Sequence, residues 1–197
     1  MTAGSGPDSA DNRYAAFLRG INIGGRRVTG RQLCAPFETL GMQEVTSFLA
    51  SGNVTFATAS TEGAAGCEDL ERRVEAALHG SLGFAVEVFV RTAAEVTEIV
   101  GCEPFPPDVV AATGGKLQVT FLRDEPGPGG VAEAMAHATD QDRVQVIGRE
   151  WYWLPAAGIS TSALNVKAVE RALGRGTTRT LNTVARLRAK LRPDPPG

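Results

Sequence analysis

The residues best suited to chemistry lie in a glycine-rich stretch near the start of the chain. Residues 18–27 read LRGINIGGRR, which places glycines between arginines. A turn of this kind exposes backbone N–H groups, and where it leads into a helix it can receive an anion. Arginine binds phosphate or carboxylate through two parallel hydrogen bonds. We therefore predict an anion site that includes Arg19, Gly20, Asn22, Gly24, Gly25 and Arg26.

The same stretch is similar to a phosphate-binding P-loop but differs from it at the positions that contact phosphate and magnesium. Gly20 and Gly25 have the required separation, and a cation follows. However, Arg26 stands where lysine is needed, and Arg27 stands where Ser or Thr would hold magnesium, which excludes a nucleotide hydrolase. In the alternative interpretation, the glycines only provide left-handed turn geometry and close packing.

A second polar turn, Ser51, Gly52 and Asn53, lies within the apolar residues 49–56, LASGNVTF. Ser51 and Asn53 can hydrogen-bond a ligand that the first loop holds. Alternatively, Gly and Asn only supply the unusual backbone angles of a hairpin turn. No histidine is placed to activate Ser51 as a nucleophile.

A third polar group, Arg179, Asn182 and Thr183, lies where an extended segment enters the last predicted helix. Thr180 can cap this helix through Thr183, which is a structural role. Arg179 would add a cation at a helix N-terminus that already favours anions. The basic residues that follow spread around the helix, and nucleic-acid contact is the alternative interpretation of them. They are Arg186, Arg188, Lys190 and Arg192.

The remaining reactive residues predict neither a metal, nor a cofactor, nor a catalytic set. His79 and His137 lack carboxylates or cysteines at ligand spacing. The three cysteines are widely spaced without a C-x-x-C pair, and there is no signal peptide, which favours a reducing cytoplasm. No apolar run approaches the roughly 20 residues that span a bilayer, so no membrane partner is expected.

Hydrophobic periodicity predicts the elements that position these turns. In the first half it indicates strands at 14–19, 44–50, 54–57 and 85–91, with helices at 29–40 and 67–82. In the second half it indicates strands at 117–123, 143–147, 151–154 and 177–180, with helices at 131–138, 161–173 and 182–191. Leaving out the last helix, each half has the order β-α-β-β-α-β. No residue-by-residue repeat is evident, so duplication is inferred from element order.

This order predicts an α+β protein of two ferredoxin-like (αβ-plait) subdomains with an extra C-terminal helix. We expect a disordered leader at 1–12 and an N-terminal subdomain at 13–92. A connecting helix and Pro-rich linker follow at 93–115, then a C-terminal subdomain with the terminal helix at 116–192 and a tail at 193–197.

Three blocks, taken together, resemble the bacterial family known as domain of unknown function 1697. They are LRGINIGG at 18–25, SGNVTF at 51–56 and TTRTLNTVARL at 177–187. The resemblance extends over about residues 13–191 and implies two αβ-plait subdomains, with no established activity. Leu181 stands where the family usually has an aromatic residue, so a stacking contact at that place would be missing here.

The leading hypothesis is a cytoplasmic bacterial protein that binds a phosphate-bearing small molecule without catalysis. The formal net charge of −2 provides no overall attraction to nucleic acid, which is the alternative ligand. A second hypothesis is an enzyme acting on a small phosphorylated substrate, with Arg and Asn stabilising developing charge. A third is a module that dimerises through open sheet edges, so we expect a monomer or a homodimer.

Overall fold

The computed structural model describes residues 12–22, 24–49, 52–58, 63–113 and 116–191 of the 197-residue chain. The predicted tail and all but the last residue of the predicted leader lie outside these ranges. The described residues form two four-stranded antiparallel sheets and seven α-helices, an α+β arrangement. The chain divides into two compact units, and each is described by itself. One comprises Met1–Glu98 with Arg186–Gly197, and the other Ile99–Ala185.

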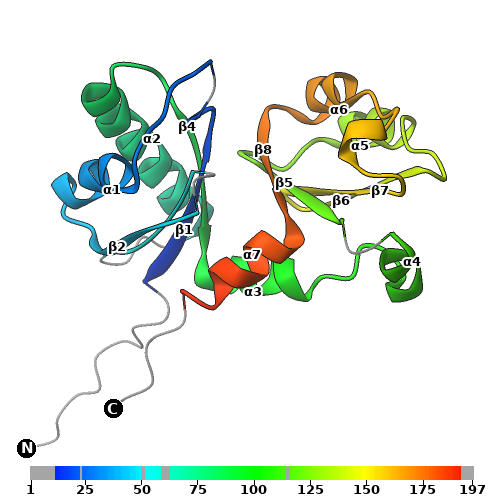
Figure 1. The fold of residues 1–197 in the computed structure, drawn as a ribbon, viewed down its shortest axis with the longest axis horizontal. Coiled ribbons are helices and arrows are strands. Elements are labelled where there is room, and N and C mark those ends of the chain that lie inside the picture. Colours follow the sequence, from blue (N-terminus) through cyan, green and yellow to red (C-terminus); the bar gives the residue numbers. More distant parts are fainter. Residues whose placement is uncertain (1–11, 23, 50–51, 59–62, 114–115, 192–197) are drawn as a thin grey trace, which may run out of the picture. The chain divides into compact units, whose positions relative to one another are not determined.

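The sheet of the first unit has the strand order β2-β3-β1-β4. Its strands are β1 (Arg13–Arg19), β2 (Gln43–Phe48), β3 (Asn53–Ala57) and β4 (Glu87–Thr92). Helices α1 (Gly30–Thr39) and α2 (Gly63–Leu82) cover one face of this sheet (Figure 1). Three aromatic rings form the centre of the core, because Phe56 lies 5.4 Å from Tyr14 and 5.3 Å from Phe37 between ring centroids.

Local sequence determines both ends of α1. The Thr29 hydroxyl accepts from the Gln32 N–H, and the Gln32 side chain accepts from the Thr29 N–H, which is the predicted capping box. Gly41 follows the helix with φ +81°, a left-handed conformation that costs glycine little. Helix α2 begins at Gly63, earlier than the predicted residue 67.

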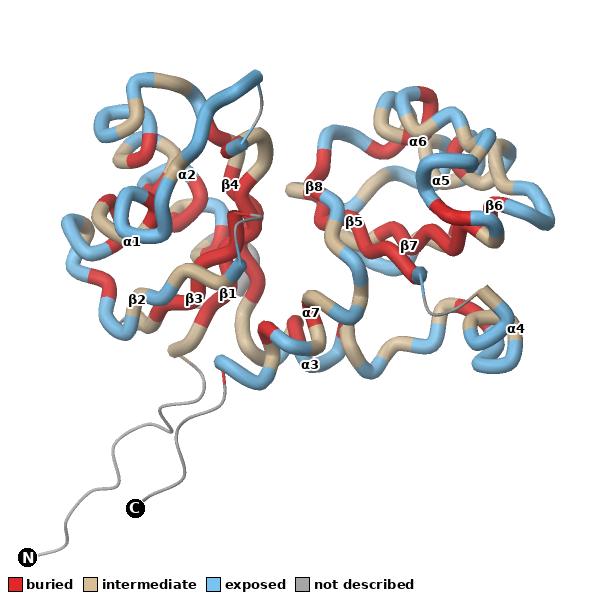
Figure 2. Tube along the Cα trace, in the orientation of Figure 1, coloured by how far each residue is buried: buried red, intermediate tan, exposed pale blue. Residues whose placement is uncertain are grey.

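The sheet of the second unit has the corresponding order, β6-β7-β5-β8. Its strands are β5 (Gln118–Leu122), β6 (Asp142–Ile147), β7 (Glu150–Pro155) and β8 (Gly176–Thr180). Helices α5 (Pro128–Met135) and α6 (Val166–Leu173) cover one face (Figure 1). The rings of Trp151 and Trp153 stack beneath them at 6.5 Å. Central strands of both sheets are almost wholly buried, as Figure 2 shows in red.

The remaining helices differ in part from the prediction. Helix α3 (Ala93–Gly101) follows β4 as expected, but α4 (Pro107–Ala112) forms where a Pro-rich bend was predicted. A short 3₁₀ turn, Ile159–Thr161, replaces the start of the predicted helix 161–173, and α6 begins only after Asn165, which caps it. Helix α5 begins at Pro128 because proline suits the first helical position.

The last helix, α7 (Leu181–Arg188), begins in the second unit, and its end belongs to the first. The prediction assigned the whole helix to the second subdomain. Within the first unit, the Arg186 guanidinium lies 5.3 Å above the Phe48 ring. Phe48 is on the sheet face that points away from α1 and α2, so the end of α7 lies on that face. None of the helices in the described part of the chain has the length and apolarity to cross a bilayer.

Candidate anion-binding site

The glycine loop of the first unit has the left-handed geometry that its sequence predicts. Gly20, Gly24 and Gly25 have φ values of +78°, +67° and +82°. The Asn22 side-chain oxygen accepts from the Val28 N–H at 3.1 Å, which closes the loop on itself. These residues therefore determine the conformation of the turn.

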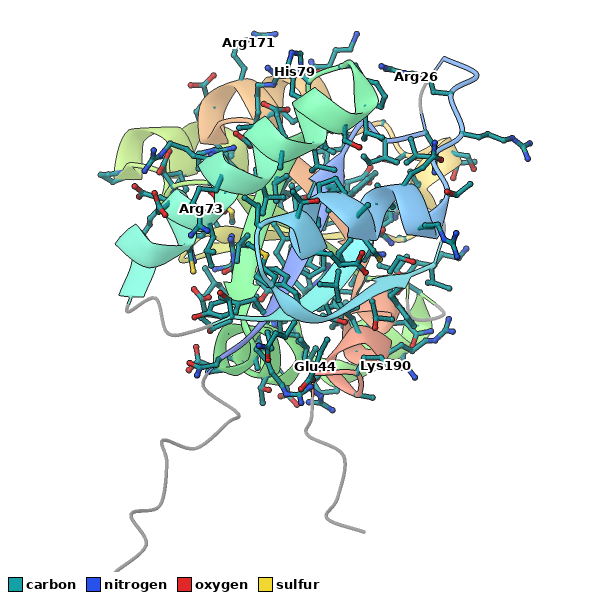
Figure 3. All side chains as sticks on the ribbon, turned by 90° about the vertical axis from the view of Figure 1, so that its left-hand side faces the viewer. Arg26, Glu44, Arg73, His79, Arg171 and Lys190 are labelled. Carbon is teal, nitrogen blue, oxygen red and sulfur yellow. The ribbon has the colours of Figure 1, made fainter. Side chains whose placement is uncertain are left out.

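The arginines beside this loop contact neighbouring side chains. Arg19 Nε lies 3.6 Å from a carboxylate oxygen of Glu87. The Arg26 guanidinium lies 4.1 Å above the Phe84 ring, a cation–π contact. In Figure 3, Arg26 is at one end of the first unit and Lys190 is at the other. Arg26 and Lys190 are therefore too far apart to bind one small anion together.

The second glycine turn packs directly against the first. The Leu18 N–H donates to the Gly52 carbonyl at 2.8 Å. Asn53 is fully buried, and its amide donates to the Phe48 carbonyl at 3.1 Å. Its side chain thus holds the turn to the end of β2. Ser51 lies outside the described residues.

The third predicted group lies in the second unit, at the junction of β8 and α7. The Thr180 hydroxyl accepts from the Thr183 N–H at 3.2 Å, which is the predicted cap. Arg179 Nη1 donates to the Thr177 hydroxyl at 2.9 Å and to the Thr178 carbonyl at 2.8 Å. Desolvation by burial lowers the pKa of Arg179 to about 10. Since neighbouring strand residues face opposite ways, Arg179 and Thr180 point to opposite faces of the sheet.

Asn182 lines an open pocket of about 570 Å³ in the second unit. The pocket lies between the start of β5, the segment after β7 and the start of α7. Polar groups come from all three, namely Lys116, Gln118, Ser160, Thr180 and Asn182. Gln118 is buried, and its amide donates to the Lys116 carbonyl at 2.6 Å, so it fixes the Lys116 backbone at the start of β5.

The pocket has a positive electrostatic character. Lys116 is the charged group among the described lining residues, and none of these residues is acidic. Its Nζ lies beside Gly158, where an added Cβ would be 3.5 Å from the ammonium nitrogen. The Leu181 N–H donates to the Leu117 carbonyl at 2.9 Å, which fixes the N-terminus of α7 against β5. Helix N-termini carry partial positive charge, so dipole and ammonium act in the same direction.

Asp142 holds the pocket wall that follows β7. Its buried carboxylate accepts from the Trp153 indole at 2.9 Å, the Ser162 hydroxyl at 2.6 Å and the Ala163 N–H at 3.3 Å. The Ala156 N–H donates to the Gln141 carbonyl at 2.7 Å. The segment that carries Gly158 and Ser160 is therefore fastened at both ends to the start of β6.

Sequence reasoning identified Asn182 but missed the residues that complete the pocket. Lys116 carried one weak signal, since it is one of three lysines and directly precedes a predicted strand. Ser160 carried none, because its segment was predicted to lead into a helix. A second open pocket of the same unit, about 670 Å³, includes both Asp140 and Arg143 and has no net charge preference. Among the described residues, no cluster of His, Cys, Asp and Glu suits a metal ion.

Comparison with known proteins gives one family and one fold. The family model described as "Protein of unknown function (DUF1697)" matches residues 12–152. The structure is similar to that of the conserved bacterial protein SP0830 from Streptococcus pneumoniae, with a TM-score of 0.69 and 18% sequence identity. The match covers 91% of this chain and 98% of that one, and at this identity it shows the fold alone. No curated protein matches the chain.

Proposed function

Because the chain belongs to the DUF1697 family of proteins of unknown function, we propose a function from its own geometry. The protein binds a small phosphate-bearing anion in the pocket beside the N-terminus of α7. The observation that carries this proposal is that Lys116, Asn182 and Ser160 line one pocket, with no acidic residue among the described lining residues. Charge-assisted hydrogen bonds of this kind are the strong ones in anion recognition.

The same pocket supports binding rather than turnover. General acid–base catalysis most often uses a His, Asp or Glu within hydrogen-bond reach of the reacting proton. None of the described lining residues is of these types. An enzyme acting on a small phosphorylated substrate is therefore the weaker hypothesis.

We further propose that both units are ferredoxin-like and that the protein is bacterial and cytoplasmic. The strand orders β2-β3-β1-β4 and β6-β7-β5-β8, with a helix after the first and third strand of each, support the fold assignment. The three free cysteines support a reducing compartment. Dimerisation through the β4 edge is disfavoured, because Glu75 and Glu71 already accept from the outward N–H groups of Val88 and Val90.

The proposal is tested by calorimetric titration of the full chain with pyrophosphate. The titration is done twice, at salt concentrations of about 50 mM and about 150 mM. Lys116→Ala should weaken binding roughly tenfold or more, since a hydrogen bond to a charged group contributes about 1.5–3 kcal/mol. Lys167→Ala is the matched control, because Lys167 is an exposed lysine on α6 of the same unit. It should bind as the wild type does.

Two outcomes contradict this site. One is the absence of pyrophosphate binding by the wild type at millimolar concentration. The other is binding that Arg26→Ala removes and Lys116→Ala leaves intact, which would assign the anion to the glycine loop of the first unit. A citrate titration separates a preference for phosphate from a preference for any compact anion.

A further inference from the structure

The first and last strands of the two units correspond residue by residue, which element order alone does not reveal. In the first unit, the Leu18 N–H donates to the Gly52 carbonyl at 2.8 Å. In the second, the Leu122 N–H donates to the Arg149 carbonyl at 2.9 Å. Both bonds join the end of the first strand of a unit to the turn before its third strand. They therefore make Leu122 the counterpart of Leu18.

Strand register extends this correspondence to the last strand of each unit. Tyr14 pairs with Thr92 in the first sheet, and Gln118 pairs with Thr180 in the second. With these pairs superposed, residues 17–19 and 121–123 both read Phe-Leu-Arg, and residues 91–92 and 179–180 both read Arg-Thr. The two matches come from separate segments. Both follow from the same superposition of the paired strands, so each supports the other.

Side-chain contacts repeat as well. Arg91 and Arg179 occupy the same place, and Nη1 of each donates at 2.8 Å to the carbonyl of the preceding residue, Val90 or Thr178. The cap repeats in the same way, because the Glu95 N–H donates to the Thr92 hydroxyl at 3.1 Å just as the Thr183 N–H does to Thr180.

At the anion pocket, however, the two units differ. The counterpart of Lys116 is Asn12, and the counterpart of Asn182 is Ala94. The third helical residue is Thr183 in α7 and Glu95 in α3. The first unit thus has an amide in place of the cation, a methyl group in place of the Asn182 amide, and a carboxylate at the helix N-terminus. That carboxylate accepts from the Thr92 N–H at 2.8 Å.

We infer that the anion site belongs to the second unit alone and that Thr183 is a specificity-determining residue for it. This inference rests on the proposed function. The Thr180 hydroxyl caps α7 by accepting from the Thr183 N–H, and the Thr183 hydroxyl lies 2.8 Å from it at the pocket wall without adding a negative charge. A glutamate there would cap equally well but would repel an anion.

The structure supplies a pair of variants that separates charge from capping. Glutamine caps α1 at the same helical position in this chain, as Gln32, and glutamate caps α3, as Glu95. Thr183→Gln and Thr183→Glu should therefore both leave the urea unfolding midpoint of the free protein close to that of the wild type. In a pyrophosphate titration, Thr183→Gln should bind within about twofold of the wild type, and Thr183→Glu should bind at least about tenfold more weakly.

Asn182→Ala provides a second test that does not depend on the cap. It introduces the counterpart residue Ala94 at an exposed position, and about fivefold weaker pyrophosphate binding is expected from the lost hydrogen bond. Glu95→Gln in the first unit is the control and should leave binding unchanged.

The outcomes distinguish this inference from the proposed function. Failure of the wild type to bind, or binding that Lys116→Ala does not change, overturns both. If Lys116→Ala weakens binding while Thr183→Glu binds as Thr183→Gln does, the assignment of Thr183 is wrong and the pocket stands. A change in binding with Glu95→Gln would show that the first unit also binds the anion.

Discussion

The indole N–H of Trp153 donates to the carboxylate of Asp142 at 2.9 Å, and both residues are buried. This bond connects the core of the second unit to the wall of its pocket, because the other two donors to the carboxylate belong to Ser162 and Ala163. Through these three hydrogen bonds, the buried carboxylate of Asp142 anchors the end of the wall segment that carries Gly158 and Ser160.

We predict that Asp142→Ala destabilises the protein by about 3 kcal/mol, since it leaves the buried Trp153 indole and two partly buried donors without their acceptor. Asp142→Asn, which keeps one acceptor oxygen, should cost about half as much. Urea unfolding followed by tryptophan fluorescence measures both. Asp140→Ala is the control at an exposed position nearby, with an expected change within about 0.5 kcal/mol. Equal unfolding free energies for the two alanine variants would contradict the assigned role of Asp142.

Gly52→Ala should destabilise the first unit by about 2 kcal/mol for two reasons. An alanine at φ +71° is strained, and its Cβ would in addition be crowded by neighbouring atoms. An added Cβ would be 3.2 Å from the Leu18 carbonyl oxygen and 3.3 Å from Ile21 Cγ1. Gly24→Ala is the matched control, since Gly24 has φ +67° and no atom within 4 Å of the added Cβ. It should lose only the conformational part, about 1 kcal/mol. Thermal or urea unfolding of the two variants gives the difference, and equal losses would exclude crowding as its cause.

Features of the fold that depend on neighbouring residues were predictable from the sequence. The capping box of Thr29 and Gln32 and the stop at Gly41 involve residues within one turn of each other. The start of α6 was predicted too early because Ser162 is bound by Asp142, a contact between segments far apart in the chain. Periodicity contains no information on such a contact.

The site was predictable only in part for the same reason. Asn182 was identified from the polar entry to a helix, whereas Lys116 reaches the pocket through the pairing of β5 with β8. The internal repeat was hidden because the offset in residue number differs between the first and last strands of the units. A comparison at one fixed spacing therefore cannot match Phe-Leu-Arg and Arg-Thr together.

Arg179 predicts a specific response to alkaline pH. Its pKa in the folded chain, about 10, is below the ordinary 12.5, so the unfolded chain binds this proton more tightly. The contribution of Arg179 to stability therefore rises as the pH increases above about 10. The unfolding free energy of the wild type minus that of Arg179→Met should increase by about 1 kcal/mol between pH 8 and pH 11, because that range covers roughly the first pH unit above the folded pKa. Urea unfolding at both pH values measures it.

The exposed Arg171→Met serves as the control for that experiment and should show no such increase. Because Arg179 faces away from Thr180 and the pocket, Arg179→Met should also leave pyrophosphate binding unchanged. Loss of binding would show that Arg179 contacts the anion and would contradict the orientation that the strand register gives it.

The edge strand β4 should become available for pairing with another chain when the carboxylates of α2 that accept from its N–H groups are removed. Glu71 accepts from the Val90 N–H at 2.7 Å, and Glu75 accepts from the Val88 N–H at 2.9 Å, so both occupy donors that an edge strand otherwise presents to another chain. Glu71→Ala should cost about 3 kcal/mol because Glu71 is fully buried, and Glu75→Ala about 1–2 kcal/mol. Light scattering of Glu75→Ala should show concentration-dependent association that the exposed-site control Glu68→Ala lacks. Identical scattering and unfolding for these two variants would show that the Glu75 carboxylate does not protect the edge.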